Sequence, residues 1–466
     1  MKNADGKGEF ILKTKIKHGL VSTFSIFIVV IFLLAVNLFI NKFDLKYDLT
    51  KEKLYTISEQ TKKIIDGVNQ KINIYVLASS ENTNLVMKKL LEQYNTKNIK
   101  VEYKDPAKFP GFAKKFETGD SIQDNSVIVS GEKKFKVIDA NDLASYDYDY
   151  ETFQTKLKSI DVEPQITNAI RYVLNESSSV IYYLIGHGEL KFDDTYKKQI
   201  ALANYQIKDL DLITANEIPS DCKILFIATA QRDWTLSESE KIDKFLQGGG
   251  KAIFCIDCIK DDFANMTKVI KNYGFEFAKA IVVENSGSNF TDNNNLYLLP
   301  NYTDNEITHQ LEEKNYKMFV PFCQSISIND NENVKPLLVS SDNSYGKTNL
   351  ESNTIAKEKD DLSGPLDLAV LSEKNKTKII AVGSTSVLDP AANSYIGRTN
   401  SEFIVRALNY LNGEDNNLYI PPKTHEVERI VFTQTQSLLI SAACTIIIPT
   451  VIFVIGFIIV RARRKK

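Results

Sequence analysis

The sequence predicts an α/β protein whose largest part is a mostly parallel sheet with flanking helices, held between two membrane spans. Three observations indicate this. Two long charge-free apolar segments lie near the ends of the chain, short apolar strands alternate with helices after residue 156, and a smaller strand–helix set precedes them. The 466 residues, 43% hydrophobic and 25% charged, have an ordinary globular composition and suffice for two or three domains.

The two apolar segments, residues 19–40 and 437–460, contain no charged residue and predict one transmembrane helix near each terminus. At about 1.5 Å per residue the first spans roughly 33 Å, enough for a hydrocarbon core of about 30 Å. A pair of buried core helices is the alternative, but charge-free runs of this length disfavour it. Residues 19–40 also exceed the apolar region of a cleaved signal peptide, about 7–15 residues, which predicts an uncleaved anchor.

Charge predicts the orientation of the chain. Residues 1–18 form a basic tail of net charge +3, and residues 461–466 form a second one of +5. Basic flanks stay on the cytoplasmic side of a membrane. Since the total is −2, about −10 remains for everything between the tails. We therefore expect a two-pass protein of the cell membrane with both termini cytoplasmic and an acidic main domain outside.

Residues 41–155 are predicted to form a small extracytoplasmic α/β domain. Strand patterns begin at Ile72, Ile99 and Ser126, and a helical pattern covers residues 82–94. The resulting β-α-β-β-β order predicts a thioredoxin-like outline. A Tyr/Asp run at residues 145–153 then reads as a solvated linker, with a carbohydrate- or cation-binding loop as the alternative.

Residues 156–413 are predicted to form the main extracytoplasmic domain, followed by a connector over residues 414–436. Short continuous apolar strands alternating with helices favour a mostly parallel sheet covered on both faces. Within this region Ser237 and Glu240 have capping-box spacing for a helix over Glu238–Leu246, and three glycines from Gly248 end that helix.

Sequence motifs for catalysis are missing from this chain. The Gly346-Lys347-Thr348 triplet lacks the earlier glycine of a phosphate-binding loop, because Ser341 occupies that place. Gly250-Lys251 lacks the following Ser or Thr, and no G-x-S-x-G elbow occurs. Cys255 and Cys258 have CxxC spacing, but they lie in an apolar run without a second pair, which favours buried small residues over a zinc or redox site. We expect no catalytic residues, no metal and no cofactor.

The chemically suggestive segment is Gly186-His187-Gly188-Glu189, which follows a predicted strand. The carboxyl edge of a parallel sheet is where ligands usually bind. His187 and Glu189 could do acid–base work or hold a cation there, or they could satisfy backbone groups in a glycine-permitted turn. Asp233 and Asp257 follow neighbouring strands and are second candidates for the same crevice.

The chain resembles the GldG-like family, auxiliary components of uncharacterised, gliding-motility-type ABC transport systems. The resemblance covers nearly the whole chain and is carried by the order of its motifs. These are D-L-T-K-E-K-L-Y-T-I-S (48–58), L-I-G-H-G-E (184–189), L-L-V-S-S-D-N-S-Y (337–345), G-P-L-D-L-A-V-L (364–371), V-G-S-T-S (382–386), N-S-E-F-I-V-R-A-L-N-Y-L (400–411) and I-P-P-K (420–423).

The resemblance implies an amidotransferase-like or flavodoxin-like core and a non-catalytic accessory subunit working with a separate ABC ATPase and a multi-span ABC-2-type permease. The lipid bilayer is a further expected partner, and an acidic exterior disfavours nucleic acid. The extracytoplasmic domain would bind substrate or partner subunits. Two alternatives stay open: a membrane-anchored hydrolase or glycan-processing enzyme using His187 and Glu189, and a plain surface scaffold.

Overall fold

A computed structural model of the chain describes two units, residues 1–56 and residues 57–466. The described residues are 27–29, 31–32, 48, 50, 53–81, 83–117, 121–149, 154–174, 179–190, 192–229, 231–259, 261–330, 332–352, 354–413, 420–424 and 432–463. Of the predicted span 19–40, residues 27–29 and 31–32 are described and helical. The rest of that prediction, the tail 1–18 and most of the connector lie outside the described residues.

The first sheet of the larger unit has four strands in the order β2-β1-β3-β4. β1 pairs in parallel with β2 and antiparallel with β3, and β4 continues from β3. The elements are α2 (Glu59–Asp66), β1 (Ile72–Val76), α3 (Leu85–Glu92), β2 (Ile99–Tyr103), η1 (Ala113–Phe116), β3 (Val127–Ser130), β4 (Phe135–Ile138) and η2 (Ala140–Asp142). This is the β-α-β-β-β order that the sequence predicts; its thioredoxin-like character stays a prediction.

Helix α4 (Val162–Val173) packs on this small sheet. A Cβ on Gly131, in the turn between β3 and β4, would lie 3.1 Å from Val173, and the Tyr94 hydroxyl lies 2.7 Å from Thr167 Oγ1 of α4. A second, three-stranded sheet has the order β22-β6-β5, with β5 and β6 before α4 in the sequence and β22 near the C-terminal end of the domain. Its strands are β5 (Ala144–Asp149), β6 (Gln154–Ile160) and β22 (Lys423–Thr424).

The main sheet has twelve strands and is mixed, which corrects the prediction of a mostly parallel sheet. Its parallel half is β21-β10-β9-β7-β8, formed by β7 (Ser179–Ile185), β8 (Tyr205–Asp211), β9 (Cys222–Ala228), β10 (Lys251–Cys255) and β21 (Thr377–Val382). The antiparallel half comprises β11 (Phe275–Val283), β14 (Asn301–Tyr302), β16 (Gln324–Ile328), β17 (Val334–Val339), β18 (Tyr345–Lys347), β19 (Leu362–Ser363) and β20 (Asp367–Lys374).

The direction changes because the antiparallel half lacks long crossover helices. Between β11 and β20 the described residues form only the five-residue helix α8 (His309–Glu313), and a parallel connection needs a dozen or more residues. β20 then turns directly into β21 through Asn375, whose φ is 58°. A fourth, three-stranded sheet is inserted in this half, with β12 (Phe290–Thr291), β13 (Asn294–Leu298) and β15 (Val320–Pro321).

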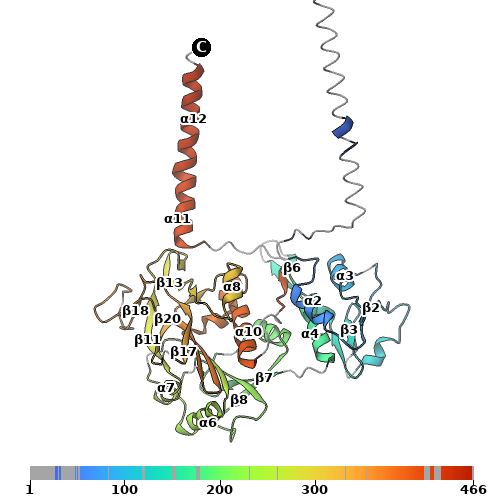
Figure 1. The fold of residues 1–466 in the computed structure, drawn as a ribbon, viewed down its shortest axis with the longest axis horizontal. Helices are drawn as coiled ribbons and strands as arrows, with labels where there is room; N and C mark the ends of the chain where they lie inside the picture. The colour runs from blue at the N-terminus through green and yellow to red at the C-terminus, as the bar shows by residue number, and fades with distance from the viewer. Residues whose placement is uncertain are drawn as a thin grey trace, which may run out of the picture. The chain divides into compact units, whose positions relative to one another are not determined.

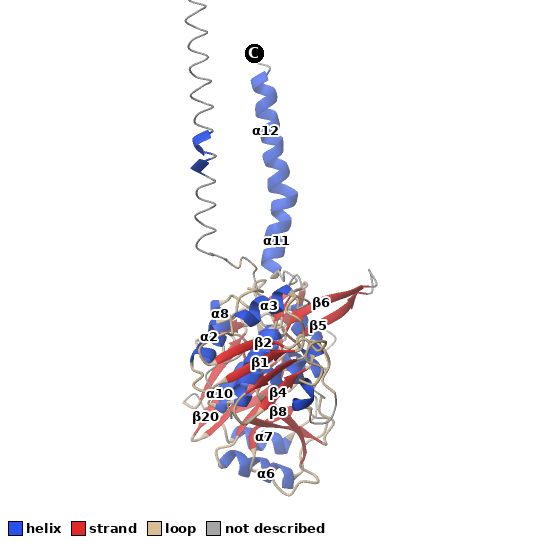
Figure 2. Ribbon diagram, turned by 90° about the vertical axis from the view of Figure 1, so that its right-hand side faces the viewer, coloured by secondary structure: helices blue, strands red, loops and turns tan. Residues whose placement is uncertain are grey.

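Helices cover both faces of the parallel half, as the sequence predicts (Figures 1 and 2). Helices α6 (Leu236–Gln247) and α7 (Ala264–Lys271) pack on one face, and α5 (Asp194–Leu202) and α10 (Thr399–Asn412) pack on the other. Successive residues of each strand belong alternately to the two hydrophobic cores. Phe254 packs in the core under α6 and α7, whereas Ile253 packs in the core under α5 and α10. The short elements η3 (Thr385–Leu388) and α9 (Pro390–Tyr395) lead into α10.

The chain ends in one continuous helix made of α11 (Gln434–Ala442), η5 (Ala443–Ile447) and α12 (Ile448–Arg463) (Figure 1). Gln434–Ile458 has a mean hydropathy of 2.7 and is long and apolar enough to cross a membrane. It is the one such helix among the described residues, whereas the sequence predicted one near each terminus. The π-helical turn η5 precedes Pro449, which cannot donate a helical hydrogen bond.

Candidate functional site

The candidate site begins at the turn that follows β7, residues 186–189, which we call the His187 turn. Gly186 and Gly188 have φ of 118° and 81°, backbone angles that favour glycine. A Cβ on Gly188 would also lie 3.1 Å from the Gln231 side chain. The turn is fixed to the loop after β9, because Gln231 N donates to His187 O at 2.8 Å and Arg232 donates to Gly186 O at 2.9 Å.

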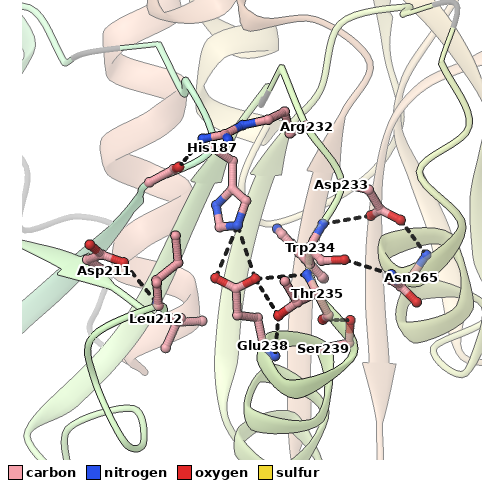
Figure 3. A network of polar contacts seen from close by, with 12 residues as sticks. His187, Asp211, Leu212, Arg232, Asp233, Trp234, Thr235, Glu238, Ser239 and Asn265 are labelled. Carbon is pink, nitrogen blue, oxygen red and sulfur yellow. Dashed lines mark hydrogen bonds and ion pairs between the residues drawn. The ribbon is translucent and has the colours of Figure 1, made fainter.

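His187 lies buried between two carboxylates, with 4% of its surface exposed. Its Nδ1 is 3.0 Å from Glu189 Oε1. Its Nε2 is 3.1 Å from Glu238 Oε1 and 3.2 Å from Glu238 Oε2, and the second contact is a hydrogen bond (Figure 3). The backbone N–H of His187 also donates to Glu189 Oε2 at 2.8 Å. A neutral imidazole could donate to only one of the two carboxylates, whereas an imidazolium donates to both. Both ring nitrogens are therefore occupied within the protein.

Glu238 connects this turn to the start of α6. Its Oε2 accepts from Thr235 N at 2.8 Å, and Thr235 Oγ1 accepts from Glu238 N at 3.3 Å, which together form a capping box (Figure 3). Thr235 Oγ1 also donates to Glu238 Oε2 at 2.7 Å. The box predicted from Ser237 and Glu240 is wrong by two residues. Burial raises the pKa of Glu238, but hydrogen bonds from Thr235 and His187 outweigh burial and hold this pKa below its ordinary value.

The Asp233 carboxylate caps the start of α7. Its carboxylate accepts from the backbone N–H groups of Asn265 at 2.8 Å and Met266 at 3.2 Å, at the first turn of the helix, and from Trp234 N at 2.9 Å. Figure 3 shows the side chain turned toward α7. Asp233 thus satisfies N–H groups that a helix start leaves without partners.

Asp257, which follows β10, binds the loop after β21. It accepts from Thr385 N and Thr385 Oγ1, both at 2.6 Å, and from Ser384 Oγ at 3.4 Å. Carboxylates therefore connect the four loops that follow β7, β9, β10 and β21 at the carboxyl edge. His187 makes no hydrogen bond or ion pair with Asp233 or Asp257 among the described residues, so the six candidates share an edge without forming one polar cluster.

The cysteines of this region are free thiols in the structure. Burial raises the pKa of Cys258 to about 11 and raises that of Cys255 further, which disfavours the reactive thiolate. The described residues contain no group of three His, Cys, Asp or Glu side chains placed to hold a metal ion.

Exposed apolar side chains surround the His187 turn. Leu190 is 44% exposed, Ile213 in the loop after β8 is 62% exposed, and Leu236 at the start of α6 is 67% exposed. A Cβ on Gly186 would lie 3.6 Å from Ile213, and Leu236 is two residues before Glu238. We call these three side chains the apolar rim.

The region that carries the site matches a known family. Residues 178–407, from β7 to α10, match the family described as "ABC-type uncharacterized transport system". We call this matched region the transport-system domain. All six candidate residues and Glu238 lie inside this transport-system domain. The match bears out the auxiliary-component part of the resemblance, whereas its GldG-like specificity stays a prediction. Residues 51–141, which include the small sheet, match a separate domain of unknown function.

Relatives extend the likeness beyond the transport-system domain. A protein of Borreliella burgdorferi (strain ATCC 35210), described as "Uncharacterized protein", is 23% identical over an alignment 522 positions long that covers 97% of this chain and 99% of the relative. Among solved structures, the mmIFT52 N-terminal domain aligns with a TM-score of 0.40 and 16% identity over 50% of this chain and 97% of its own. A ThuA-like protein of Parabacteroides merdae aligns with 0.34 and 10% over 56% and 96%.

Sequence reasoning placed His187 and Glu189 at the carboxyl edge of the sheet and missed Glu238, the second carboxylate in contact with His187. Glu238 lies 51 residues away and carried a visible signal, because Thr235 and Glu238 also have capping-box spacing. The glycine-permitted turn, weighed against acid–base catalysis, describes the observed geometry of Gly186–Glu189.

Proposed function

We propose that this chain is a non-catalytic, membrane-anchored accessory subunit of an ABC-2-like transport system. The observation that carries the proposal is the family match of residues 178–407. The apolar helix Gln434–Ile458 supports membrane anchoring. The occupied ring nitrogens of His187 support a binding role over proton transfer, because a general base needs a free nitrogen.

The proposed arrangement has two spans, residues 19–40 and 437–460, with both termini in the cytoplasm and the transport-system domain outside. An ABC ATPase and a multi-span permease would then be separate chains, and the extracytoplasmic domain would bind substrate or a partner subunit. The basic tails support this topology through the positive-inside rule.

Within this arrangement we assign the docking of a partner subunit to the apolar rim and the His187 turn. The rim exposes large apolar side chains on three loops. The His187 and Arg232 contacts fix the loops after β7 and β9, and the bond from Lys241 Nζ to Leu212 O fixes the loop after β8. Prepositioned apolar groups lower the ordering cost of association. Arg232, exposed beside the rim, adds a residue type enriched at interfaces.

Co-purification tests the accessory role. The full chain, tagged at its C-terminus, is isolated from its native membranes in a mild detergent, and the accompanying proteins are identified by mass spectrometry. An ATPase and a multi-span permease in stoichiometric amount are the expected result. Recovery of the chain alone under gentle conditions would contradict the proposal. Accessibility of the C-terminal tag to a membrane-impermeant reagent in intact cells would contradict the topology.

A pair of matched variants tests the docking edge. Leu236→Asp places a charge on the rim, and Leu85→Asp places the same charge on α3. Both leucines are exposed, at 67% and 60%, and both occupy the first position of a helix, where an acidic side chain is favourable. Leu236→Asp is expected to reduce co-purification of the permease at least tenfold, and Leu85→Asp to leave it unchanged. Equal recovery with both variants would exclude the rim as the docking surface.

A further inference from the structure

A cavity of about 490 Å³ opens at the amino edge of the parallel strands, opposite the His187 turn. It lies where β9 and β10 begin and where α6 ends at Gly248. Its size falls within the range of small-molecule sites, about 300–1,000 Å³. The sequence motif Gly250-Lys251, which no predicted function used, forms part of its lining.

The lining is strongly cationic in a chain of net charge −2. The charged residues of the lining are one carboxylate, that of Glu217, and four lysines, Lys223, Lys241, Lys244 and Lys251. Their formal charges sum to +3. The nearby Asp221 carboxylate is already bound by Lys208 at 2.9 Å and by the Tyr182 hydroxyl at 3.0 Å.

The four ammonium groups are not neutralised equally within the protein. Lys241 Nζ donates to the carbonyls of Leu212 and Ala215, both at 2.8 Å, which holds this charge in place. Lys244 is 3.8 Å from Glu217, in an exposed and therefore weak ion pair. Lys223 and Lys251 have no hydrogen-bonding or ion-pair partner for their side chains within the described part of the chain.

Lys251 is the clearest sign that a counter-charge is missing. Partial burial, together with the ammonium groups of Lys378 and Lys223, lowers the pKa of Lys251. Lys378 itself is paired with Glu373 at 2.7 Å, whereas Lys251 is not paired. A half-buried cation beside other cations is unfavourable in the free protein, and a bound anion would relieve this repulsion.

Lysines near the end of a helix can also serve only to offset its dipole. The C-terminus of α6 carries a partial charge of about −0.5, which Lys244 alone can offset. The helix dipole does not explain Lys223 and Lys251, because both residues lie on strands. A net charge of +3 outweighs the helix terminus, so the cavity attracts anions.

We propose that this cavity binds a small organic phosphate, with the phosphate group held by Lys223, Lys244 and Lys251. Lysine binds phosphate as a point charge, without the planar geometry that carboxylate recognition by arginine uses. The apolar part of the lining, Ile218 and the ring of Phe245, would contact the organic part of the ligand. The ring position is fixed, because Phe245 packs on Gly250, where a Cβ would lie 2.5 Å from it.

Calorimetric titration of the full chain in detergent, at constant ionic strength, tests this site. The probes are phenyl phosphate, which has both parts of the proposed ligand, and inorganic phosphate, which has only the anion. The site variant is Lys223→Gln with Lys251→Gln. The control is Lys97→Gln with Lys268→Gln, which removes the same charge from two exposed lysines elsewhere. Trp234 fluorescence checks that each variant is folded.

Saturable binding of phenyl phosphate, tighter than that of inorganic phosphate, is expected for the wild-type chain. The site variant should bind at least about tenfold more weakly, since hydrogen bonds to charged groups are the strong ones, and the control should bind as the wild type does. Because the site variant removes repelling cations, it should unfold at the same or a higher urea concentration. Absence of saturation, equal weakening in both variants, or equal affinity for the two probes would overturn the proposal.

Discussion

Glu238 is the side chain on which the His187 turn and the start of α6 both depend. Its carboxylate accepts two hydrogen bonds from Thr235 and faces His187 Nε2, and it is buried. Glu238→Ala removes all three interactions at once. Glu238→Gln keeps an acceptor for the capping box, where glutamine is also found, and removes only the charge facing His187.

The expected cost follows from the interactions that each variant removes. Loss of the Thr235 hydrogen bonds to the Glu238 carboxylate costs about 1 kcal/mol, and a buried His187 nitrogen left without a partner costs about 1–3 kcal/mol. Glu238→Ala should therefore lower the free energy of unfolding by about 2–4 kcal/mol, and Glu238→Gln by about 1 kcal/mol. Glu240→Ala on the same helix is the control, because Glu240 is exposed and should change the free energy by less than about 0.5 kcal/mol.

The single tryptophan of the chain provides the assay. Trp234 is 2% exposed and precedes Thr235, so its fluorescence reports on unfolding of this edge. Urea titrations of the full chain in detergent give the free energy of unfolding of each variant. If Glu238→Ala costs no more than Glu240→Ala, the buried His187–Glu238 contact does not hold the edge, and the reasoning is refuted.

Acidification gives the same contact a second test. Because the pKa of Glu238 is lower in the folded chain than its ordinary value of 4.5, the folded state binds this proton less readily than the unfolded state. The stabilisation is present in full above pH 4.5 and is lost as pH falls through the folded pKa. The difference between wild type and Glu238→Gln should therefore be constant near neutral pH and shrink in acid. A difference that grows on acidification would show that the pKa is raised instead.

The remaining variants address the same edge through the same fluorescence assay. His187→Ala should cost about 2–4 kcal/mol, because it leaves two buried carboxylates without their shared donor; an unchanged stability with lost transport would favour catalysis instead. Gly188→Ala should cost about 1–2 kcal/mol because of its φ of 81°, whereas Gly111→Ala, with no atom within 4 Å of the new Cβ, should be neutral. Asp233→Ala should cost about 1–2 kcal/mol through the lost cap of α7 and leave the wavelength of folded Trp234 emission nearly unchanged.

Local sequence patterns predicted the parallel half of the main sheet but not the antiparallel half. Strands such as Ser179–Ile185 and Cys222–Ala228 are continuous apolar runs followed by helices, a pattern that specifies direction as well as position. The strands from Phe275 to Lys374 have no such helices between them, so their directions are set by turns and by pairing over long distances.

Helix α4 shows the same limit of local sequence patterns. Its apolar stripe predicts a buried face, but it does not reveal which of two sheets covers that face.

The sequence predicted which edge of the sheet carries the site, but it did not predict the polar contacts around His187. A glycine on each side of His187 marks a turn after a strand, and that much depends on neighbouring residues alone. The partner of His187 depends on where α6 begins, and the sequence offers two overlapping capping boxes, from Thr235 and from Ser237. The structure uses Thr235, because Glu238 is then buried against His187 while Glu240 faces solvent. A contact between loops, not a local propensity, decides this choice.

Helix α6 joins the two proposed binding regions, since its first turn carries Leu236 and Glu238 and its end borders the lysine-lined cavity. Twelve residues at about 1.5 Å each separate these ends by roughly 18 Å, well beyond the range of about 7–10 Å within which substitutions interact directly. Leu236→Asp and the Lys223/Lys251 double substitution should therefore act independently, the first on partner recovery and the second on phosphate binding. If phenyl phosphate instead changes partner recovery in the wild-type chain and not in the lysine variant, the two ends are coupled. Helix α6 is then the rigid element that both ligands bias, because it is the element common to both regions.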